Sequence, residues 1–185
     1  MSVDDPQARF RRLFDDAERD LLAYALRRVD RPDDAADIVA ETFLVAWRRL
    51  DDVPAGAEAR LWLYGVARRQ LANQRRGHLR RSQLADRLRE ALPAAVACTE
   101  SQDDRGGAVL AALARLDEED RELLALSGWE ELSPGEIAVV LRISAVTARS
   151  RLHRARKRLR AELARDDASL SSACSSTTLK STETR

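Results

Sequence analysis

The stretch LSPGEIAVVLRISAVTARSRLHRA, at residues 132–155, constrains the fold more than any other part of the chain. Ser133 can cap a helix that has Pro134 at its first position and Glu136 at the capping-box position. A tight turn follows at Arg142–Ser144, after which a second helix starts. Two helices joined by so short a turn predict a helix-turn-helix, in which the second helix enters the major groove of DNA.

The second helix separates apolar from polar residues. Ala148, Leu152, Ala155 and Leu159 recur at i, i+4, i+7 and i+11 and predict its buried side. Arginine side chains on the other side can reach guanine edges or phosphates, and hydroxyl groups can reach either. The basic segment Arg154–Arg160 would follow the phosphate backbone. The residues of this predicted DNA-binding surface are Ser144, Thr147, Arg149, Ser150, Arg151, His153, Arg154 and Lys157.

The alternative to DNA binding is a chance pattern on a solvated, arginine-rich helix. We favour DNA binding because four features agree: the helix cap, the small Ala138 that permits close helix packing, the turn length and the separation of charge. Residues 143–160 hold seven Arg or Lys and no acidic residue, although the whole chain has 32 Lys plus Arg against 31 Asp plus Glu. Because charges are screened over about 8–10 Å in physiological salt, this basic block acts independently of the net charge.

A second basic block occupies residues 59–81, after the turn signal VPAG. It keeps helical spacing and contains seven Arg and no acidic residue. A nucleic-acid surface needs cations for phosphates, planar groups for unstacked bases and amides for base edges. A solvated basic helix, facing water or an acidic neighbour, explains this block equally well when it is taken alone. The candidate DNA-binding residues here are Trp62, Arg68, Arg69, Asn73, Arg75 and Arg76.

Two further helices are predicted near the N-terminus. Residues 7–29 carry apolar residues at helical spacing, Pro32 interrupts the pattern, and Asp33 or Asp34 can cap a second helix that runs to Asp51. The side of this second helix that faces a core is predicted to consist of Val39, Phe43, Ala46, Trp47 and Leu50. The opposite side is either solvated surface or a docking face for a partner, and its residues are Asp37, Glu41, Leu44 and Arg48.

Composition favours helices throughout. Ala, Leu, Arg, Glu and Asp dominate, Gly and Pro are sparse and aromatic residues make up 4% of the chain, so we expect an all-α fold. The helical pattern fails at residues 92–107, which predicts a flexible linker between a domain at 1–91 and a domain at 108–164. The Ser/Thr-rich tail at 165–185 is expected to be disordered.

Several functional classes lack their sequence signals. No apolar run approaches the roughly 20 residues of a membrane span and no signal peptide is visible, so we expect a cytoplasmic protein without membrane insertion. Cys98 and Cys174 make neither a disulfide framework nor a metal spacing. His78 and His153 lie among arginines, and no ligand cluster or catalytic arrangement is present. We therefore expect no metal, no cofactor and no enzymatic activity.

Three motifs in this order resemble the extracytoplasmic-function (ECF) class of bacterial sigma factors, over about residues 8–163. They are DAADIVAETFLVAWRRLD, WLYGVARRQLANQRRG and LSPGEIAVVLRISAVTARSRLHRARKRLR. The resemblance implies a subunit that binds core RNA polymerase and directs it to promoter DNA. It implies that the domain at 1–91 resembles sigma region 2 and reads an opened −10 element. The helix-turn-helix domain at 108–164 would resemble sigma region 4 and read a duplex −35 element.

The resemblance also implies partners and residue roles. Asn73 matches a position that lies beside a flipped-out base in relatives, and relatives are commonly held by an anti-sigma factor. The chain departs from the family pattern at Arg142, where Gly is frequent, and at Ala148, where a larger β-branched residue is frequent. A helix-turn-helix regulator that uses residues 1–92 for dimerisation or sensing remains the alternative. The residues implied to contact the clamp coiled coil of the largest polymerase subunit are Asp37, Glu41, Leu44 and Arg48.

Overall fold

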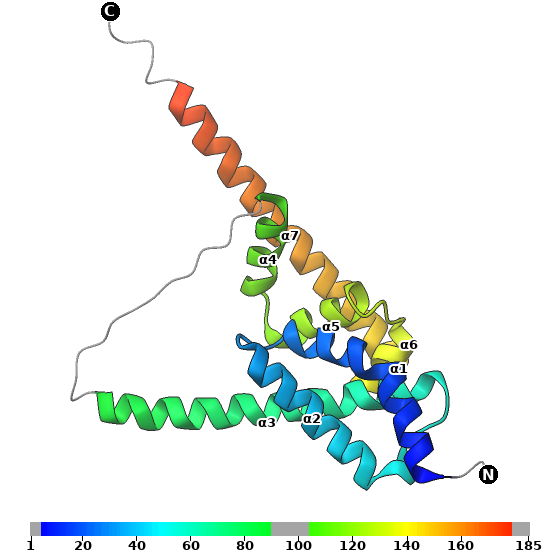
Figure 1. The fold of residues 1–185 in the computed structure, drawn as a ribbon. Coiled ribbons are helices and arrows are strands. Elements are labelled where there is room, and N and C mark those ends of the chain that lie inside the picture. The colour runs from blue at the N-terminus through cyan, green and yellow to red at the C-terminus, as the bar shows by residue number, and fades with distance from the viewer. Residues whose placement is uncertain (1–4, 90–103, 179–185) are drawn as a thin grey trace, which may run out of the picture. The chain divides into compact units, whose positions relative to one another are not determined.

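The computed structural model describes residues 5–89 and 104–178, and every regular element within these ranges is a helix (Figure 1). The elements are α1 (Pro6–Leu26), α2 (Pro32–Arg48), the short 3₁₀ helix η1 (Leu50–Asp52), α3 (Ala57–Arg89), α4 (Asp104–Arg115), α5 (Glu118–Gly128), α6 (Pro134–Leu141) and α7 (Ala145–Thr178). The described residues therefore confirm the predicted all-α fold.

The chain divides into two compact units. The first contains α1, α2, η1 and α3, and the second contains α4, α5 and α7. Helix α6 is divided, because Ala138–Arg142 group with the first unit. The prediction of two helical domains is confirmed.

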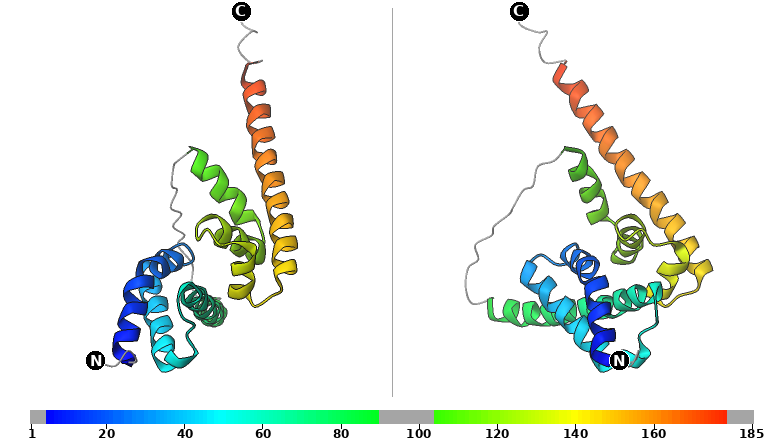
Figure 2. Two further views of the ribbon diagram at one scale, coloured as in Figure 1. Left: turned by 90° about the vertical axis from the view of Figure 1, so that its right-hand side faces the viewer. Right: turned by 45° about the vertical axis from the view of Figure 1, so that its right-hand side comes forward.

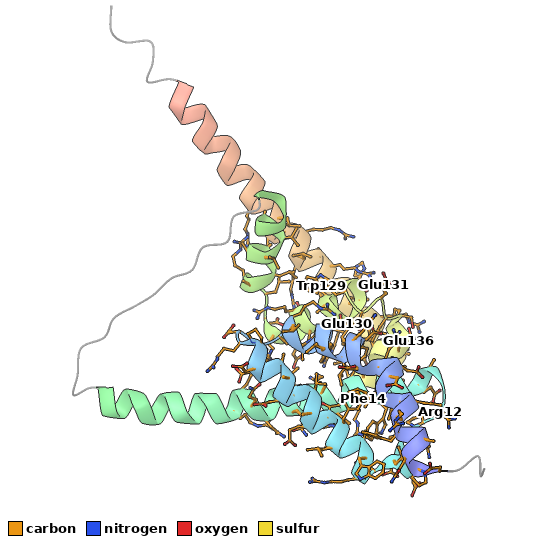
Figure 3. The ribbon with its side chains drawn as sticks, in the orientation of Figure 1. Arg12, Phe14, Trp129, Glu130, Glu131 and Glu136 are labelled. Atoms are coloured by element: carbon orange, nitrogen blue, oxygen red, sulfur yellow. The ribbon has the colours of Figure 1, made fainter. Side chains whose placement is uncertain are left out.

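In the first unit, α1 and α2 pack against each other and against α3 (Figures 1 and 2). Tyr24 of α1 is fully buried and its ring centroid lies 4.9 Å from that of Tyr64 on α3. Phe14 lies between α1 and α2 (Figure 3), with its ring centroid 4.7 Å from that of Phe43. The turn before α3 uses Gly56, whose φ of 63° is in the left-handed region that glycine adopts without strain. Aromatic and aliphatic packing thus fixes α3 against the N-terminal helices.

Helix α2 differs from its prediction in two respects. Arg31, rather than Asp33 or Asp34, is the N-cap residue, and Pro32 occupies the first turn instead of only interrupting the pattern. Proline is tolerated there because the N–H it lacks would have no partner inside the helix, and the two aspartates in the first turn favour the positive end of the helix dipole. No side-chain cap is therefore required.

The buried side of α2 is also rotated. Val39 is half-buried and Trp47 is 45% exposed, although both were predicted to face a core, whereas Ile38 and Thr42 are buried. The helix contacts both α1 and α3, so its buried surface is wider than one stripe. The Thr42 hydroxyl donates a 2.7 Å hydrogen bond to the Ile38 carbonyl, which satisfies this buried polar group. The remaining predicted core residues are buried, and they are Phe43, Ala46 and Leu50.

In the second unit, α4 and α5 pack against α7. Leu123 and Leu126 of α5 and Leu152 of α7 are buried in this unit. Asp117 caps α5, because its carboxylate accepts a 2.8 Å hydrogen bond from the backbone N–H of Asp120. The packing holds α7, which carries the predicted DNA-binding surface.

The ends of two helices lie outside the predicted bounds. α4 begins at Asp104 inside the predicted linker, and α7 continues to Thr178 inside the predicted disordered tail. For α7 the reason is that no Gly or Pro occurs after Gly135 to end the helix. Extending an existing helix requires only one more ordered residue for each hydrogen bond gained. The rest of the predicted linker, with Cys98, lies outside the described residues, as does the tail beyond Thr178.

Within the described ranges, none of the helices combines the length and the apolar character that crossing a bilayer requires.

Candidate nucleic-acid interface

The start of α6 has the predicted capping box. The backbone N–H of Glu136 donates to the Ser133 hydroxyl oxygen at 3.3 Å, and the backbone N–H of Ser133 donates to the Glu136 carboxylate at 2.8 Å. Glu136 lies at this end of α6 (Figure 3), and Pro134 is the first helical residue. Two backbone donors at the helix start are thereby satisfied, which fixes where the helix-turn-helix begins.

The turn between α6 and α7 keeps its tight form without glycine. Arg142 has a φ of 55°, a left-handed conformation that costs a non-glycine residue about 1 kcal/mol. Ser144 then caps α7, because its hydroxyl oxygen accepts from the Thr147 backbone N–H at 3.1 Å, and the two hydroxyl groups lie 2.8 Å apart. Ser144 and Thr147, both predicted to contact DNA, thus bond to each other at the first turn.

The two sides of α7 are arranged as predicted. Ala148, Leu152 and Ala155 are buried and Leu159 is half-buried. Three candidates directly opposite this side, at helical spacing, are exposed: Ser150, His153 and Lys157. Arg149 and Arg154 flank them and are exposed as well. Val146 shares the outward side and exposes 67% of its surface, although the sequence pattern did not single it out.

One flank of α7 carries ion pairs that the sequence pattern did not predict. Arg151 lies 3.1 Å from the carboxylate of Glu119, and Arg158 lies 3.4 Å from that of Asp117 and also bonds to buried Asp120. The hydrogen bond from Arg158 to Asp120 raises the pKa of the Arg158 guanidinium. These charges line a surface pocket between α5 and α7. The apparently unbalanced cations of α7 are therefore partly balanced by the acidic start of α5.

The candidate DNA-binding side chains on α3 lie at the surface of the first unit. Trp62 is half-buried, and the exposed members of the set are Arg68, Arg69, Asn73, Arg75 and Arg76. Spacings of seven, eleven and fourteen residues from Trp62 place Arg69, Asn73 and Arg76 on its side of the helix. The side-chain oxygen of Asn73 accepts a hydrogen bond from Arg76.

Two of these arginines have further interactions inside the unit. Arg75 reaches the carbonyl of Arg28, just beyond α1, at 3.5 Å. Partial burial lowers the pKa of the Arg69 guanidinium, and neighbouring arginines, Arg49 and Arg68 among them, lower it further. Arginine stays charged at neutral pH even so, because its ordinary pKa is far higher. The helix therefore presents a cationic surface that also carries an indole and an amide.

The outward side of α2 is as predicted, since Asp37, Glu41, Leu44 and Arg48 are all exposed. Leu44 exposes 45% of its surface. An open groove of about 600 Å³ lies beside α2, where the ring centroids of Phe10 and Trp47 are 5.2 Å apart. The groove is lined by Gln7, Phe10, Arg11, Phe14, Asp15 and Trp47.

Comparison with known proteins agrees with the division of the chain into two helical units. The chain matches the family model of sigma-70 region 2 over residues 13–82 and that of sigma-70 region 4 over residues 106–159. It is 33% identical over 163 residues to the ECF RNA polymerase sigma factor SigL of Mycobacterium tuberculosis, with 84% of this chain and 89% of SigL covered. It is 30% identical over 152 residues to the ECF sigma factor EcfG of Rhodopseudomonas palustris, with 80% of this chain and 81% of EcfG covered.

A solved structure shows a similar fold. The structure of the sigma factor RpoE in complex with the anti-sigma factor NepR, from Bartonella quintana, matches with a TM-score of 0.63 and 27% identity. The match covers 83% of this chain and 96% of RpoE.

Two helical regions that match sigma-70 regions 2 and 4, the second with a helix-turn-helix, define a sigma-70 family protein. The chain belongs to the ECF RNA polymerase sigma factors. Members of this family initiate transcription and are not enzymes, which confirms the sequence prediction.

Proposed function

We propose that the two cationic helices bind two different forms of promoter DNA, with α7 reading a duplex −35 element and α3 holding the opened −10 element. The observation that carries the proposal is the difference between the two surfaces. The outward side of α7 carries Ser150 and His153 among exposed arginines, which suits the major groove. The surface of α3 adds Trp62 and Asn73 to its arginines, which suits unstacked bases.

On α3, the proposed roles follow from the chemistry of each side chain. Arg68, Arg69, Arg75 and Arg76 bind phosphates, while Trp62 offers a ring for stacking and Asn73 an amide for a base edge. Opening base pairs costs free energy, and contacts that exist only with the opened strand shift the equilibrium toward it. In this way the protein would promote melting, while RNA synthesis stays with the polymerase.

On α7, Arg149, Ser150 and His153 are the proposed base readers, because they are exposed near the N-terminal end of the helix that enters the groove. Arg154 and Lys157 would bind phosphates along the helix. The hydroxyls of Ser144 and Thr147 would contribute through the cap that orients this end of the helix. Arg151 would orient α7 through Glu119 and remain close enough to the surface to meet a phosphate.

For the polymerase, we propose that the outward side of α2 contacts the clamp coiled coil of the largest subunit. Leu44 is exposed among charged residues, so it can supply an apolar contact at the centre of an interface while its charged neighbours supply polar contacts around it. The residues of this proposed contact are Asp37, Glu41, Leu44 and Arg48. A subunit of the polymerase acts where the chromosome lies, so this proposal also places the protein in the cytoplasm.

An anti-sigma factor is a further proposed partner, because the similar RpoE structure contains one. The groove beside Phe10 and Trp47 is a candidate surface for it, since both aromatic rings line the groove and Trp47 is 45% exposed. Such a partner would hold the protein away from polymerase until it is released.

A reconstituted transcription assay tests the proposal. Core RNA polymerase with this protein should initiate at a specific promoter at which core polymerase alone does not. Asn73→Ala should weaken open-complex formation without changing duplex −35 binding. Arg149→Ala should weaken duplex binding by about 1–3 kcal/mol. Arg31→Ala, which removes an exposed arginine 3.3 Å from Asp33, is the control and should change neither step.

The same assay separates this function from that of a helix-turn-helix regulator that does not bind polymerase. Leu44→Arg should abolish co-purification with core polymerase and leave the binding of isolated duplex unchanged. A wild-type chain that binds specific duplex DNA but has no measurable affinity for core polymerase would contradict the proposal.

A further inference from the structure

Val146 is the most exposed of the large hydrophobic residues in the described part of the chain, at 67% of its surface. It lies in the first turn of α7, two residues after the capping Ser144. Four, seven and eleven residues further on, Ser150, His153 and Lys157 share its side of the helix. Val146 thus begins the outward stripe of the helix that is proposed to enter the major groove.

Val146 lies outside the buried face of its helix. That face is made by Ala148, Leu152 and Ala155 on the opposite side. The cap is made by Ser144 and Thr147 without its side chain. Valine is also a weaker helix former than alanine because its branched side chain is restricted in a helix. A single exposed apolar residue is ordinary on a protein surface, but this one lies where base edges are read.

The chemistry of the major groove identifies what such a side chain would meet. Base edges there present hydrogen-bond donors and acceptors, and the 5-methyl group of thymine is their distinctive apolar feature. Polar neighbours on the same face, Arg149 and Ser150, are suited to the donors and acceptors. The two methyl groups of Val146 are suited to the thymine methyl.

We propose that Val146 is a specificity-determining residue that packs against the 5-methyl group of a thymine in the −35 duplex. The inference rests on the proposed function of α7. It predicts that the preferred −35 element contains a thymine opposite the first turn of α7. It further predicts that removing the 5-methyl group of the thymine, or both methyl groups of Val146, abolishes the same contact.

The experiment first selects the preferred duplex from a random library with holoenzyme, reconstituted from the full chain and bacterial core RNA polymerase. Each thymine of the selected −35 element is then replaced singly by deoxyuridine, which lacks only the 5-methyl group. Duplex affinities are measured by fluorescence anisotropy for wild type, Val146→Ala and Val146→Thr. Val109→Ala is the matched control, because Val109 is an exposed valine on α4 of the same unit. Circular dichroism checks that all variants are folded.

At one thymine, wild-type protein should lose about fourfold in affinity when the methyl is removed, the change expected for one buried methyl group. Val146→Ala should be weaker than wild type on the thymine duplex and should show no further loss on the deoxyuridine duplex. Val146→Thr, which keeps one methyl, should lie between them, and Val109→Ala should behave as wild type. This pattern is the coupling that a double-mutant cycle detects.

Other outcomes overturn the inference in distinguishable ways. A preferred element without thymine, or a loss on deoxyuridine that is equal in wild type and Val146→Ala, refutes the role of Val146 while leaving duplex recognition by α7 intact. Duplex affinity that falls in Val146→Ala without coupling to any thymine would show that Val146 acts through another contact than a thymine methyl group. Failure of the library to yield any preferred duplex would refute the proposed −35 function, and this inference with it.

Discussion

The guanidinium group of Arg121 ties the end of α4 to α5. It donates hydrogen bonds to the carbonyl oxygens of Leu113 at 3.1 Å, Ala114 at 3.0 Å and Leu116 at 2.8 Å. These carbonyls lie at or just beyond the last turn of α4, where backbone acceptors lose their i+4 partners, although the Leu113 carbonyl also accepts a 3.1 Å hydrogen bond from the Leu116 N–H. Replacing Arg121 with Met keeps most of the aliphatic chain and removes all three bonds, so it isolates the contribution of the guanidinium.

The structure sets the size of the effect. The carbonyls of Leu113 and Leu116 are bonded in part-buried positions, and each of these bonds contributes about 1 kcal/mol. The bond to Ala114 is exposed, so water replaces it at little cost. The positive charge at the end of a helix adds about 0.3–1 kcal/mol, which the entropy of ordering a long side chain partly offsets. We expect Arg121→Met to destabilise the α4–α5 connection by about 2 kcal/mol.

Hydrogen exchange measured by mass spectrometry tests this value within the second unit. Amides of α4 should exchange about 30-fold faster in Arg121→Met, the equivalent of about 2 kcal/mol in opening free energy. Arg121→Lys keeps the charge but not the fork of donors, so it should show about half the loss. The control is Arg49→Met in the first unit. It removes an exposed ion pair, in which the Arg49 guanidinium lies 2.8 Å from the Asp52 carboxylate, and it should leave the exchange of α4 unchanged. Equal exchange of α4 in wild type and Arg121→Met would refute the reasoning.

Three further predictions concern the helix-turn-helix unit. Ser133→Ala breaks the capping box of α6 and should lower the unfolding free energy by about 1 kcal/mol in urea titrations. Arg142→Gly relieves the left-handed φ of 55° and should raise it by up to about 1 kcal/mol in the same titrations, whereas a loss would show that the Arg142 side chain contributes more than the strain costs. Glu119→Gln releases Arg151, so duplex binding should strengthen and the slope of log affinity against log salt should steepen by about 0.9; an unchanged slope would show that Arg151 does not reach phosphate.

Features that depend on neighbouring residues could be predicted from the sequence. The capping box of Ser133 and Glu136 forms between residues three apart, and the short turn at Arg142 follows directly from the end of one helical pattern and the start of the next. The buried stripe of α7 likewise repeats with the helical period, so Ala148, Leu152 and Ala155 were predictable.

Features that depend on packing could not be predicted in this way. Trp47 continues the periodic stripe of α2 but is 45% exposed, because α2 packs on two helices and its buried surface is centred on Ile38 and Thr42. Helix ends without a stop signal were also missed. The Ser/Thr-rich composition after residue 164 predicted disorder, yet no Gly or Pro ends α7 before Thr178.

Ion pairs between residues far apart in the sequence could not be predicted either. A count along the sequence finds seven cations and no acid at residues 143–160, which makes the whole segment resemble a phosphate-binding surface. In space, Arg151 and Arg158 turn toward acidic residues more than thirty positions earlier in the chain, at the start of α5. Those acids partly neutralise one flank of α7 and leave Arg149, His153 and Lys157 on the exposed part of the helix. The sequence therefore identifies a cationic helix, while the fold places acidic residues of α5 against one flank of it. Val146 lies on the exposed side that is proposed to meet DNA.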